Sequence, residues 1–238
     1  MNNSIRKKAI ICFSLIPVVL ILDQIIKIWV KTHFAIGDGF NLIGDWCRIL
    51  FVENEGIAFG ISFGDSAGKL ILTLFRLVAS VIILILLIKW IKKDHRMLFL
   101  VSISLIFVGA VGNLIDSCFY GLIFNESSHD QIATLFPDGS GYGKLFYGRV
   151  VDMFYFPLFE WTWPAWMPWI GGEHAEFFNA IFNLADSAVC VGVGLLIIDQ
   201  LKNDKKEGIV EEVSDSKKDK ENNEEKSENV AESAPISE

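Results

Sequence analysis

The sequence has few of the side chains on which most enzyme sites depend. Four cysteines and four histidines are scattered through 238 residues, without the C-x-x-C or H-E-x-x-H spacing that holds zinc. A G-x-S-x-G motif is also missing, which argues against a serine hydrolase with a nucleophile elbow. If the chain is an enzyme, carboxylates must carry the chemistry, and we expect neither a metal ion nor a cofactor.

Apolar residues, in contrast, are abundant: 52% of the chain is hydrophobic, and the mean hydropathy is +0.41. Such a composition is too apolar for an ordinary soluble domain. A helix of about 20 residues crosses the hydrocarbon core of a membrane, and four apolar runs have about that length. They extend over residues 9–30, 70–91, 97–115 and 177–198. The sequence therefore predicts an all-α polytopic membrane protein with four transmembrane helices.

Basic residues orient these four helices. Lys and Arg cluster at 6–8, at 89–96 and at 202–206, and positive charge favours the cytoplasmic side. The first run could be misread as a cleavable signal peptide, but no A-x-A site closes it, so an uncleaved helix is favoured. We expect a multi-pass protein of the bacterial inner membrane with both termini in the cytoplasm.

The chain divides into a membrane domain, residues 1–202, and a tail, residues 203–238. From Leu201 onward there are seven Lys against twelve Asp and Glu, so about five of the eight net negative charges lie there. The tail has almost no large apolar residues and is predicted to be a disordered cytoplasmic segment. Net acidity therefore says little about partners of the membrane domain, and we expect no nucleic acid among them.

Two segments should lie outside the membrane, residues 31–69 and an insertion at 117–176. Glycines break the apolar residues between Phe40 and Phe63, a pattern that predicts a small extracytoplasmic β-sheet. The insertion carries four tryptophans, at 161, 163, 166 and 169. They could stack on a cofactor, but Trp prefers the lipid headgroup layer, so an interfacial Trp-rich segment is the favoured interpretation.

Two aspartates, Asp152 and Asp186, border or enter a predicted span, where a carboxylate costs at least a few kcal/mol. At about 1.5 Å per helical residue, Asp23, Asn113 and Asp186 all fall in the outer half of the membrane. If the fourth helix starts at 177, then Asn179, Asn183 and Asp186 form one stripe on it. Asn113 and Asp116 likewise share a face. The sequence predicts a buried polar site that opens outward.

Five short motifs occur in a set order. They are D-Q at 23–24 with Lys27, N-E-G-I-A-F-G at 54–60, G-A-V-G-N-L-I-D at 109–116, V-V-D at 150–152 and F-N-L-A-D-S at 182–187. Each motif is weak alone, but together, on four spans, they resemble the bacterial lipoprotein signal peptidase family, or signal peptidase II. The resemblance covers about residues 21–194.

The resemblance implies an intramembrane aspartyl endopeptidase. Members of this family remove signal peptides from prolipoproteins, cutting before a cysteine that carries diacylglycerol. Lipid and diacylglyceryl prolipoproteins are the expected partners, and we expect a monomer. The implied catalytic pair is Asp152 and Asp186. Residues implied to bind substrate or support the site are Asp23, Lys27, Asn54, Gly56, Asn113, Asp116, Arg149 and Asn183.

The chemistry of such a pair follows from electrostatics. Two carboxyl groups within a few ångströms cannot both ionise in a low-dielectric site, so they share a proton. One can take a proton from an attacking water while the other polarises the peptide carbonyl.

Plainer roles stay open for the supporting residues. Asp23 and Lys27 are spaced i, i+4 and could form only an ion pair. Asn113 and Asn183 could simply bridge helices. Asp116 is expected to be structural, bonding a loop at the end of its helix.

The chain departs from the family pattern in two places. Ser117 stands where the family usually has Arg after G-N-x-x-D, and Arg149 is a candidate substitute. The connections on both sides of Asp152 are also longer than usual. A transporter with an intramembrane Asp/Asn ion site is an alternative function, but four spans without repeat symmetry are few for one. A non-catalytic scaffold would not explain Asp186.

Overall fold

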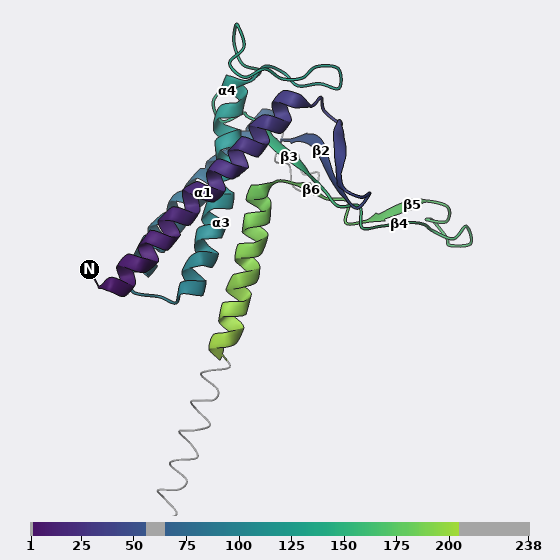
Figure 1. Cartoon of the computed structure of the whole chain (residues 1–238). Coiled ribbons are helices and arrows are strands. Elements are labelled where there is room, and N and C mark those ends of the chain that lie inside the picture. The colour runs from purple at the N-terminus through teal and green to yellow at the C-terminus, as the bar shows by residue number, and fades with distance from the viewer. Residues whose placement is uncertain (1, 56–64, 205–238) are drawn as a thin grey trace, which may run out of the picture.

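The computed structural model describes residues 2–55 and 65–204, and four of its helices are long and apolar enough to cross a membrane. They are α1 (Asn3–His33), α2 (Asp65–Lys92), α3 (Met97–Ile115) and an unlabelled C-terminal helix, Leu184–Asp204, at the lower centre of Figure 1. The prediction of a polytopic protein with four spans is confirmed. Gly56 and the tail from residue 205 lie outside the described residues.

The fourth span begins later than the sequence predicted. The run that starts at Phe177 first ends strand β5 (His174–Phe177) and then forms strand β6 (Ile181–Phe182), and the helix starts only at Leu184. Apolar length alone cannot distinguish a short strand from the first turn of a helix. The predicted stripe of Asn179, Asn183 and Asp186 along one helix is therefore wrong.

A four-stranded antiparallel sheet lies beside the upper ends of the helices (Figure 1), with strand order β1-β2-β3-β6. Strands β1 (Gly39–Ile43) and β2 (Cys47–Asn54) come from the first outer segment, where a sheet was predicted. Strand β3 (Val150–Tyr155) lies within the insertion and pairs with both β2 and β6. The sheet thus brings the first outer segment next to the start of the C-terminal helix.

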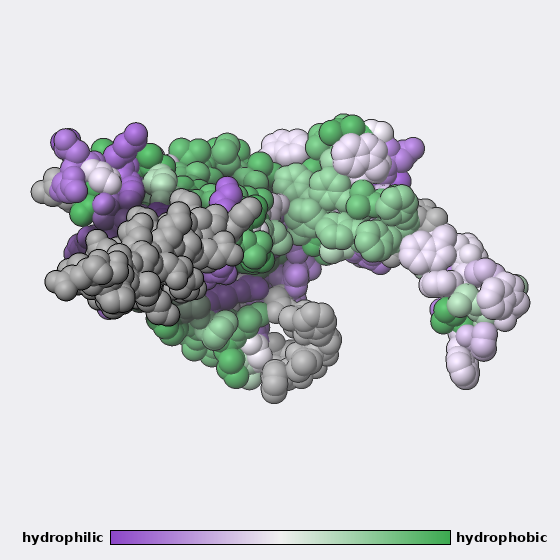
Figure 2. Space-filling view, turned by 90° about the horizontal axis from the view of Figure 1, so that it is seen from below, coloured by the Kyte–Doolittle hydropathy of each residue, from purple (hydrophilic) through white to green (hydrophobic). Residues whose placement is uncertain are grey.

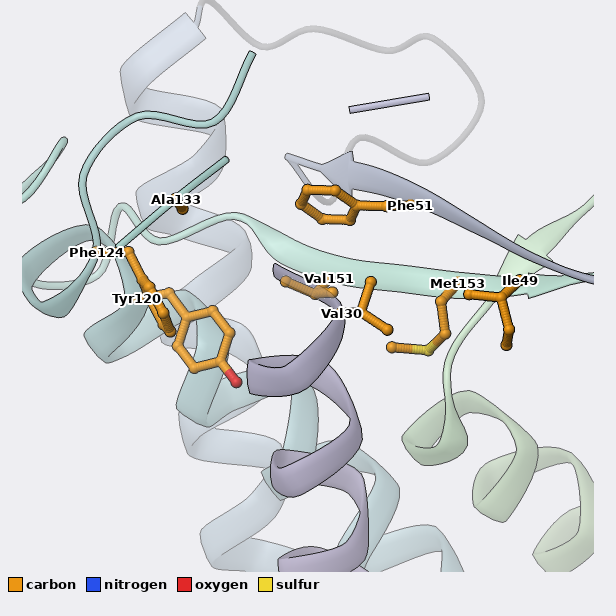
Figure 3. Close-up of a cluster of buried hydrophobic side chains, with 8 residues drawn as sticks. All are labelled: Val30, Ile49, Phe51, Tyr120, Phe124, Ala133, Val151 and Met153. Carbon is orange, nitrogen blue, oxygen red and sulfur yellow. The ribbon is translucent and has the colours of Figure 1, made fainter. Parts of the chain in front are cut away.

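The first part of the insertion packs on this sheet. Helix α3 continues into a π-helix (Asp116–Tyr120) and a short helix, α4 (Gly121–Ile123). Tyr120 and Phe124 then join a buried cluster with strands β2 and β3 and the end of α1 (Figure 3). Its members are Val30, Ile49, Phe51, Tyr120, Phe124, Ala133, Val151 and Met153. The apolar core at this end therefore fixes β3 against α1.

The Trp-rich segment forms a separate hairpin of β4 (Phe159–Thr162) and β5. It extends away from the helices in Figure 1 and projects at the right of Figure 2. Trp166 is 79% exposed and Trp169 96% exposed, so these rings are available to an outside surface. Their placement at the membrane interface stays a prediction.

The opposite end of the bundle holds both ends of the described chain (Figure 1). There Lys8 pairs with Asp94 at 2.8 Å, and Arg96 pairs with Asp199 of the C-terminal helix at 2.9 Å. Between the two ends, large hydrophobic side chains such as Ile21 on α1 remain exposed, and much of the bundle surface in Figure 2 is hydrophobic. This is the surface expected of helices that face lipid.

Two glycines allow α3 to approach the C-terminal helix closely. A Cβ atom at Gly109 would lie 2.3 Å from the carbonyl oxygen of Ala185 and 2.5 Å from Val189. One at Gly112 would lie 2.9 Å from the Cβ atom of Ala185 and 2.8 Å from the Asp23 carboxylate of α1. Small residues serve this purpose at many membrane helix interfaces. Both glycines therefore permit close helix packing at this point.

Replacing Gly109 by Ala should push the two helices apart. We expect a loss of about 1–3 kcal/mol of stability from overpacking, measured as a lower midpoint of thermal unfolding in detergent. Gly194→Ala is the matched control, because nothing lies within 4 Å of the added methyl group and Ala favours a helix. Equal unfolding midpoints for the two variants would contradict this account of the interface.

Candidate active site

A buried lysine lies at the centre of the polar residues between the helices. Lys27 of α1 is completely buried and pairs with Asp23 at 3.0 Å and with Asp116 at 2.8 Å. It also donates a hydrogen bond to Asn113 Oδ1 at 2.8 Å. The predicted i, i+4 ion pair therefore exists, but it is one part of a larger buried network. A charge at this depth persists only when it is paired.

Both carboxylates of this network also hold neighbouring backbone. Asp23 accepts a hydrogen bond from the amide of Ala185 at 2.9 Å, in the first turn of the C-terminal helix. Asp116 accepts one from the amide of Val151 at 3.4 Å, and Gln24 donates to its other oxygen at 2.9 Å. Asp116 was predicted to bond a loop at the end of its helix. It does bond backbone outside its helix, but the partner, Val151, is in strand β3. One lysine thus connects α1 and α3 with the two elements that carry Asp152 and Asp186.

Two asparagines link Asp152 to Asp186. Asn183 Nδ2 donates to Asp152 Oδ1 at 2.6 Å and to Asn113 Oδ1 at 3.0 Å. Asn113 Nδ2 donates in turn to Asp186 Oδ1 at 2.8 Å. Because Asn113 accepts from Lys27 and Asn183 through one oxygen, its amide group is oriented with the nitrogen toward Asp186. The two carboxyl groups therefore belong to one hydrogen-bond chain.

Asp152 lies on strand β3, so the expectation that it borders a lipid-spanning helix is wrong. Val151 and Met153 on either side belong to the hydrophobic core, and alternate residues of a strand point to opposite faces. Asp152 is consequently directed away from that core, and Asn54 donates to its Oδ2 at 3.2 Å. Burial, followed by the charge of Asp186, raises the pKa of Asp152 to about 6.

Asp186 lies in the first turn of the C-terminal helix and caps it with Asn183. Asn183 Oδ1 accepts from the Asp186 amide at 3.0 Å, and Asp186 Oδ2 accepts from the Asn183 amide at 3.2 Å. This is the reciprocal arrangement of a capping box. The positive end of the helix dipole also favours a carboxylate here. The local sequence N-L-A-D therefore fixes the position of Asp186 by itself.

Arg149 belongs to a neighbouring acidic cluster. Its guanidinium pairs with Glu53 at 3.2 Å and Glu55 at 3.1 Å, and it also pairs with Glu126. Glu53 contacts the buried Lys31 of α1 as well. These pairs tie the insertion and strand β2 to the end of α1, which stabilises the start of strand β3 directly after Arg149.

Most of the site residues predicted from sequence are therefore brought together. One connected network holds Asp23, Lys27, Asn54, Asn113, Asp116, Asp152, Asn183 and Asp186. Arg149 contacts the acidic cluster, and Gly56 lies outside the described residues. Lys31, Glu53 and Arg76 were not predicted to belong to the site, and Gln24 entered only as part of the D-Q motif. The rule that drew attention to Asp186, a charge within an apolar run, would have found Arg76 as well.

A metal site would require several ligand side chains close together. Within residues 2–55 and 65–204, no group of three or more His, Cys, Asp or Glu side chains could hold a metal ion.

Comparison with known proteins identifies the family. The model of the family described as signal peptidase (SPase) II matches residues 15–202, well over half of the chain. The chain belongs to the signal peptidase II family. It is 50% identical over 186 residues to a protein of Porphyromonas gingivalis named lipoprotein signal peptidase, covering 78% of this chain and 80% of that relative. A lipoprotein signal peptidase of Amoebophilus asiaticus is 34% identical, covering 76% and 73%.

A solved structure agrees with this assignment. A bacterial membrane enzyme determined by the in meso method at 2.3 Å resolution is 29% identical, with a TM-score of 0.54, covering 82% of this chain and 90% of that one. This signal peptidase II is thus a multi-pass membrane protease of the aspartic type. The transporter alternative is not favoured.

Removing the central lysine should destabilise this signal peptidase II. Lys27→Met leaves two carboxylates buried without their cation, and breaking such pairs typically costs about 3–5 kcal/mol. Thermal unfolding in detergent should show a much lower midpoint. Lys8→Met is the matched control, because it removes a partly exposed pair with Asp94 that is worth about 1 kcal/mol or less. Unfolding of Lys27→Met no earlier than that of the control would contradict the central role of Lys27.

Proposed function

We propose that this signal peptidase II removes signal peptides from diacylglyceryl-modified prolipoproteins, with Asp152 and Asp186 as its catalytic pair. The name shared by its relatives supports the substrate class. The observation that carries the residue assignment is the position of Asn183, which donates to both carboxyl groups, through its side chain to Asp152 and through its backbone to Asp186.

The proposed mechanism is general acid–base hydrolysis by a pair that shares one proton. With a pKa of about 6, Asp152 can hold a proton at mildly acidic pH while its partner is charged. The charged partner accepts a proton from water as the water attacks the peptide carbonyl, and the protonated partner donates a hydrogen bond to the carbonyl oxygen. Collapse of the tetrahedral intermediate returns a proton to the leaving amine.

The supporting residues would act by holding this pair in place. Asn54 and Asn183 bind Asp152, while Asn113 binds Asp186. Lys27 contributes indirectly by orienting Asn113. We infer that Asp23 and Asp116 position the C-terminal helix and strand β3 and do not contact the substrate.

We further propose the topology predicted by the basic residues. Both termini would face the cytoplasm of a bacterium from its inner membrane, and the site would open toward the outer face. The start of α1 and the connection between α2 and α3 lie at one end of the bundle and the sheet at the other, which supports this arrangement (Figure 1). The membrane domain, residues 1–202, would act as a monomer, with lipid around its exposed apolar helices.

The catalytic assignment is tested by replacing each aspartate separately. Asp152→Asn and Asp186→Asn should each lower cleavage of a purified diacylglyceryl prolipoprotein by at least about 10²- to 10⁴-fold, because general acid–base catalysis contributes that much. Asp138→Asn, at an exposed position, is the control and should cleave normally. Full activity in either dyad variant would remove that residue from the proposed pair.

The pH profile tests the role of Asn54. The protonated carboxyl is lost as pH rises, so kcat/KM of the wild type should fall above about pH 6, the pKa of Asp152. The hydrogen bond from Asn54 favours the charged form of Asp152. Asn54→Ala should therefore raise this pKa and move the alkaline limb to higher pH. An unchanged limb, or one at lower pH, would refute the prediction.

A further inference from the structure

Helix α2 contains one charge where only apolar residues are expected. Between Leu70 and Ile88, Arg76 is the only charged residue in the sequence. A charged side chain within a membrane span is costly and normally has a specific partner in the bundle interior. The other end of α2 packs into a hydrophobic cluster around Leu87, which a charged side chain does not stabilise. Arg76 therefore calls for an explanation within the site.

The partner of Arg76 is Ser117, in the π-helix that follows α3. Arg76 Nη1 donates to Ser117 Oγ at 3.2 Å, and Ser117 Oγ donates to the carbonyl oxygen of Asn113 at 2.9 Å. Ser117 is only 2% exposed. The guanidinium is thus held beside the segment that supplies both Asn113 and Asp116 to the site.

The Arg76 guanidinium interacts electrostatically with three carboxylates of the site, Asp186, Asp116 and Asp152. Through Ser117 it is connected to Asn113, whose side chain donates to Asp186. Asp116 already has a cation, because Lys27 lies 2.8 Å away, and Lys27 is shared with Asp23 as well. Among the described residues, Arg76 is therefore the cation left to balance Asp186.

The local structure around Asp186 favours the same charge state. Asp186 accepts hydrogen bonds from the Asn113 side chain and from the Asn183 amide. It also lies in the first turn of a long helix, where the dipole stabilises an anion. Asp152 also accepts two hydrogen bonds, but it lies on a strand, without a helix dipole, and is only 4% exposed, and burial favours a neutral carboxyl group.

We propose that Arg76 is a positioning residue that keeps Asp186 ionised as the general base and leaves the shared proton on Asp152. This inference rests on the proposed proteolytic function and deepens it, because it assigns different roles to the two aspartates. The cation that this chain lacks at position 117 is then supplied from α2, through the contact with Ser117. Arg149, which binds three glutamates, is not needed for that purpose.

The first test is Arg76→Gln, which removes the charge but keeps an N–H donor for Ser117. The charged groups that the described network connects to Asp186 are then Lys27, Asp23 and Asp116 through Asn113, and Asp152 through Asn183. Without the cation, the anionic general base loses its charge partner. The acid limb of kcat/KM should move to higher pH by about one unit or more, so activity on the acid side should fall about tenfold.

Two further variants separate charge from shape. Arg76→Lys keeps the charge and should keep the acid limb close to that of the wild type. The double variant combines Arg76→Ala with Ser117→Arg. Its new arginine is attached at the residue that now binds the Arg76 guanidinium, so the acid limb of kcat/KM should return to its wild-type position. An Arg76→Gln enzyme with an unchanged pH profile would overturn the proposal, because a merely structural role predicts that result.

The outcomes distinguish this inference from the proposed function. If the wild type does not cleave the prolipoprotein, the function itself is wrong. If the wild type cleaves and the Arg76→Gln profile is unchanged, only the role of Arg76 is wrong. Should Arg76→Gln fail to fold, the double variant decides: a folded enzyme with the wild-type acid limb supports the proposal, and a shifted limb or loss of folding overturns it.

Discussion

A single ammonium group, that of Lys27, makes the contacts on which the position of the other site residues depends. It neutralises Asp23 and Asp116, and each of these carboxylates also holds a backbone amide of another element. The same ammonium orients Asn113. Burying three charged groups is costly unless they are paired and hydrogen bonded. Keeping these charges paired requires α1, α3, strand β3 and the C-terminal helix to stay in this relative arrangement.

The site combines two kinds of support. Asp186 is fixed locally, since its capping contacts lie within four residues of chain. Asp152 depends on distant parts of the sequence: strand β2 brings Asn54, the insertion supplies core residues such as Tyr120, and the C-terminal segment brings Asn183. The long insertion is therefore part of the scaffold of the site, because its first half fills the space between β3 and α1 (Figure 3).

Much of this arrangement could be predicted from sequence, for identifiable reasons. Apolar length predicts the four spans, and polar residues at i, i+3 or i+4 predict the facing of Lys27 and Asp116. The start of the C-terminal helix could not be predicted, because Ile181 and Phe182 are equally suited to a strand that pairs with β3. The pairing of Asp152 with Asn54 depends on sheet register across 98 residues, and no local pattern encodes it. Arg76 was missed although its isolation in an apolar run was visible.

The late start of the C-terminal helix affects how the site is hydrated. A residue in the first turn of a spanning helix lies near the boundary of the hydrocarbon layer, and Asp186 is the third residue of that helix. Hydrolysis consumes one water molecule for each bond cut, and a site deep in hydrocarbon would need a dedicated channel to deliver it. In the proposed topology, the site at the end of this helix, beside a sheet, would take its water directly from the aqueous phase.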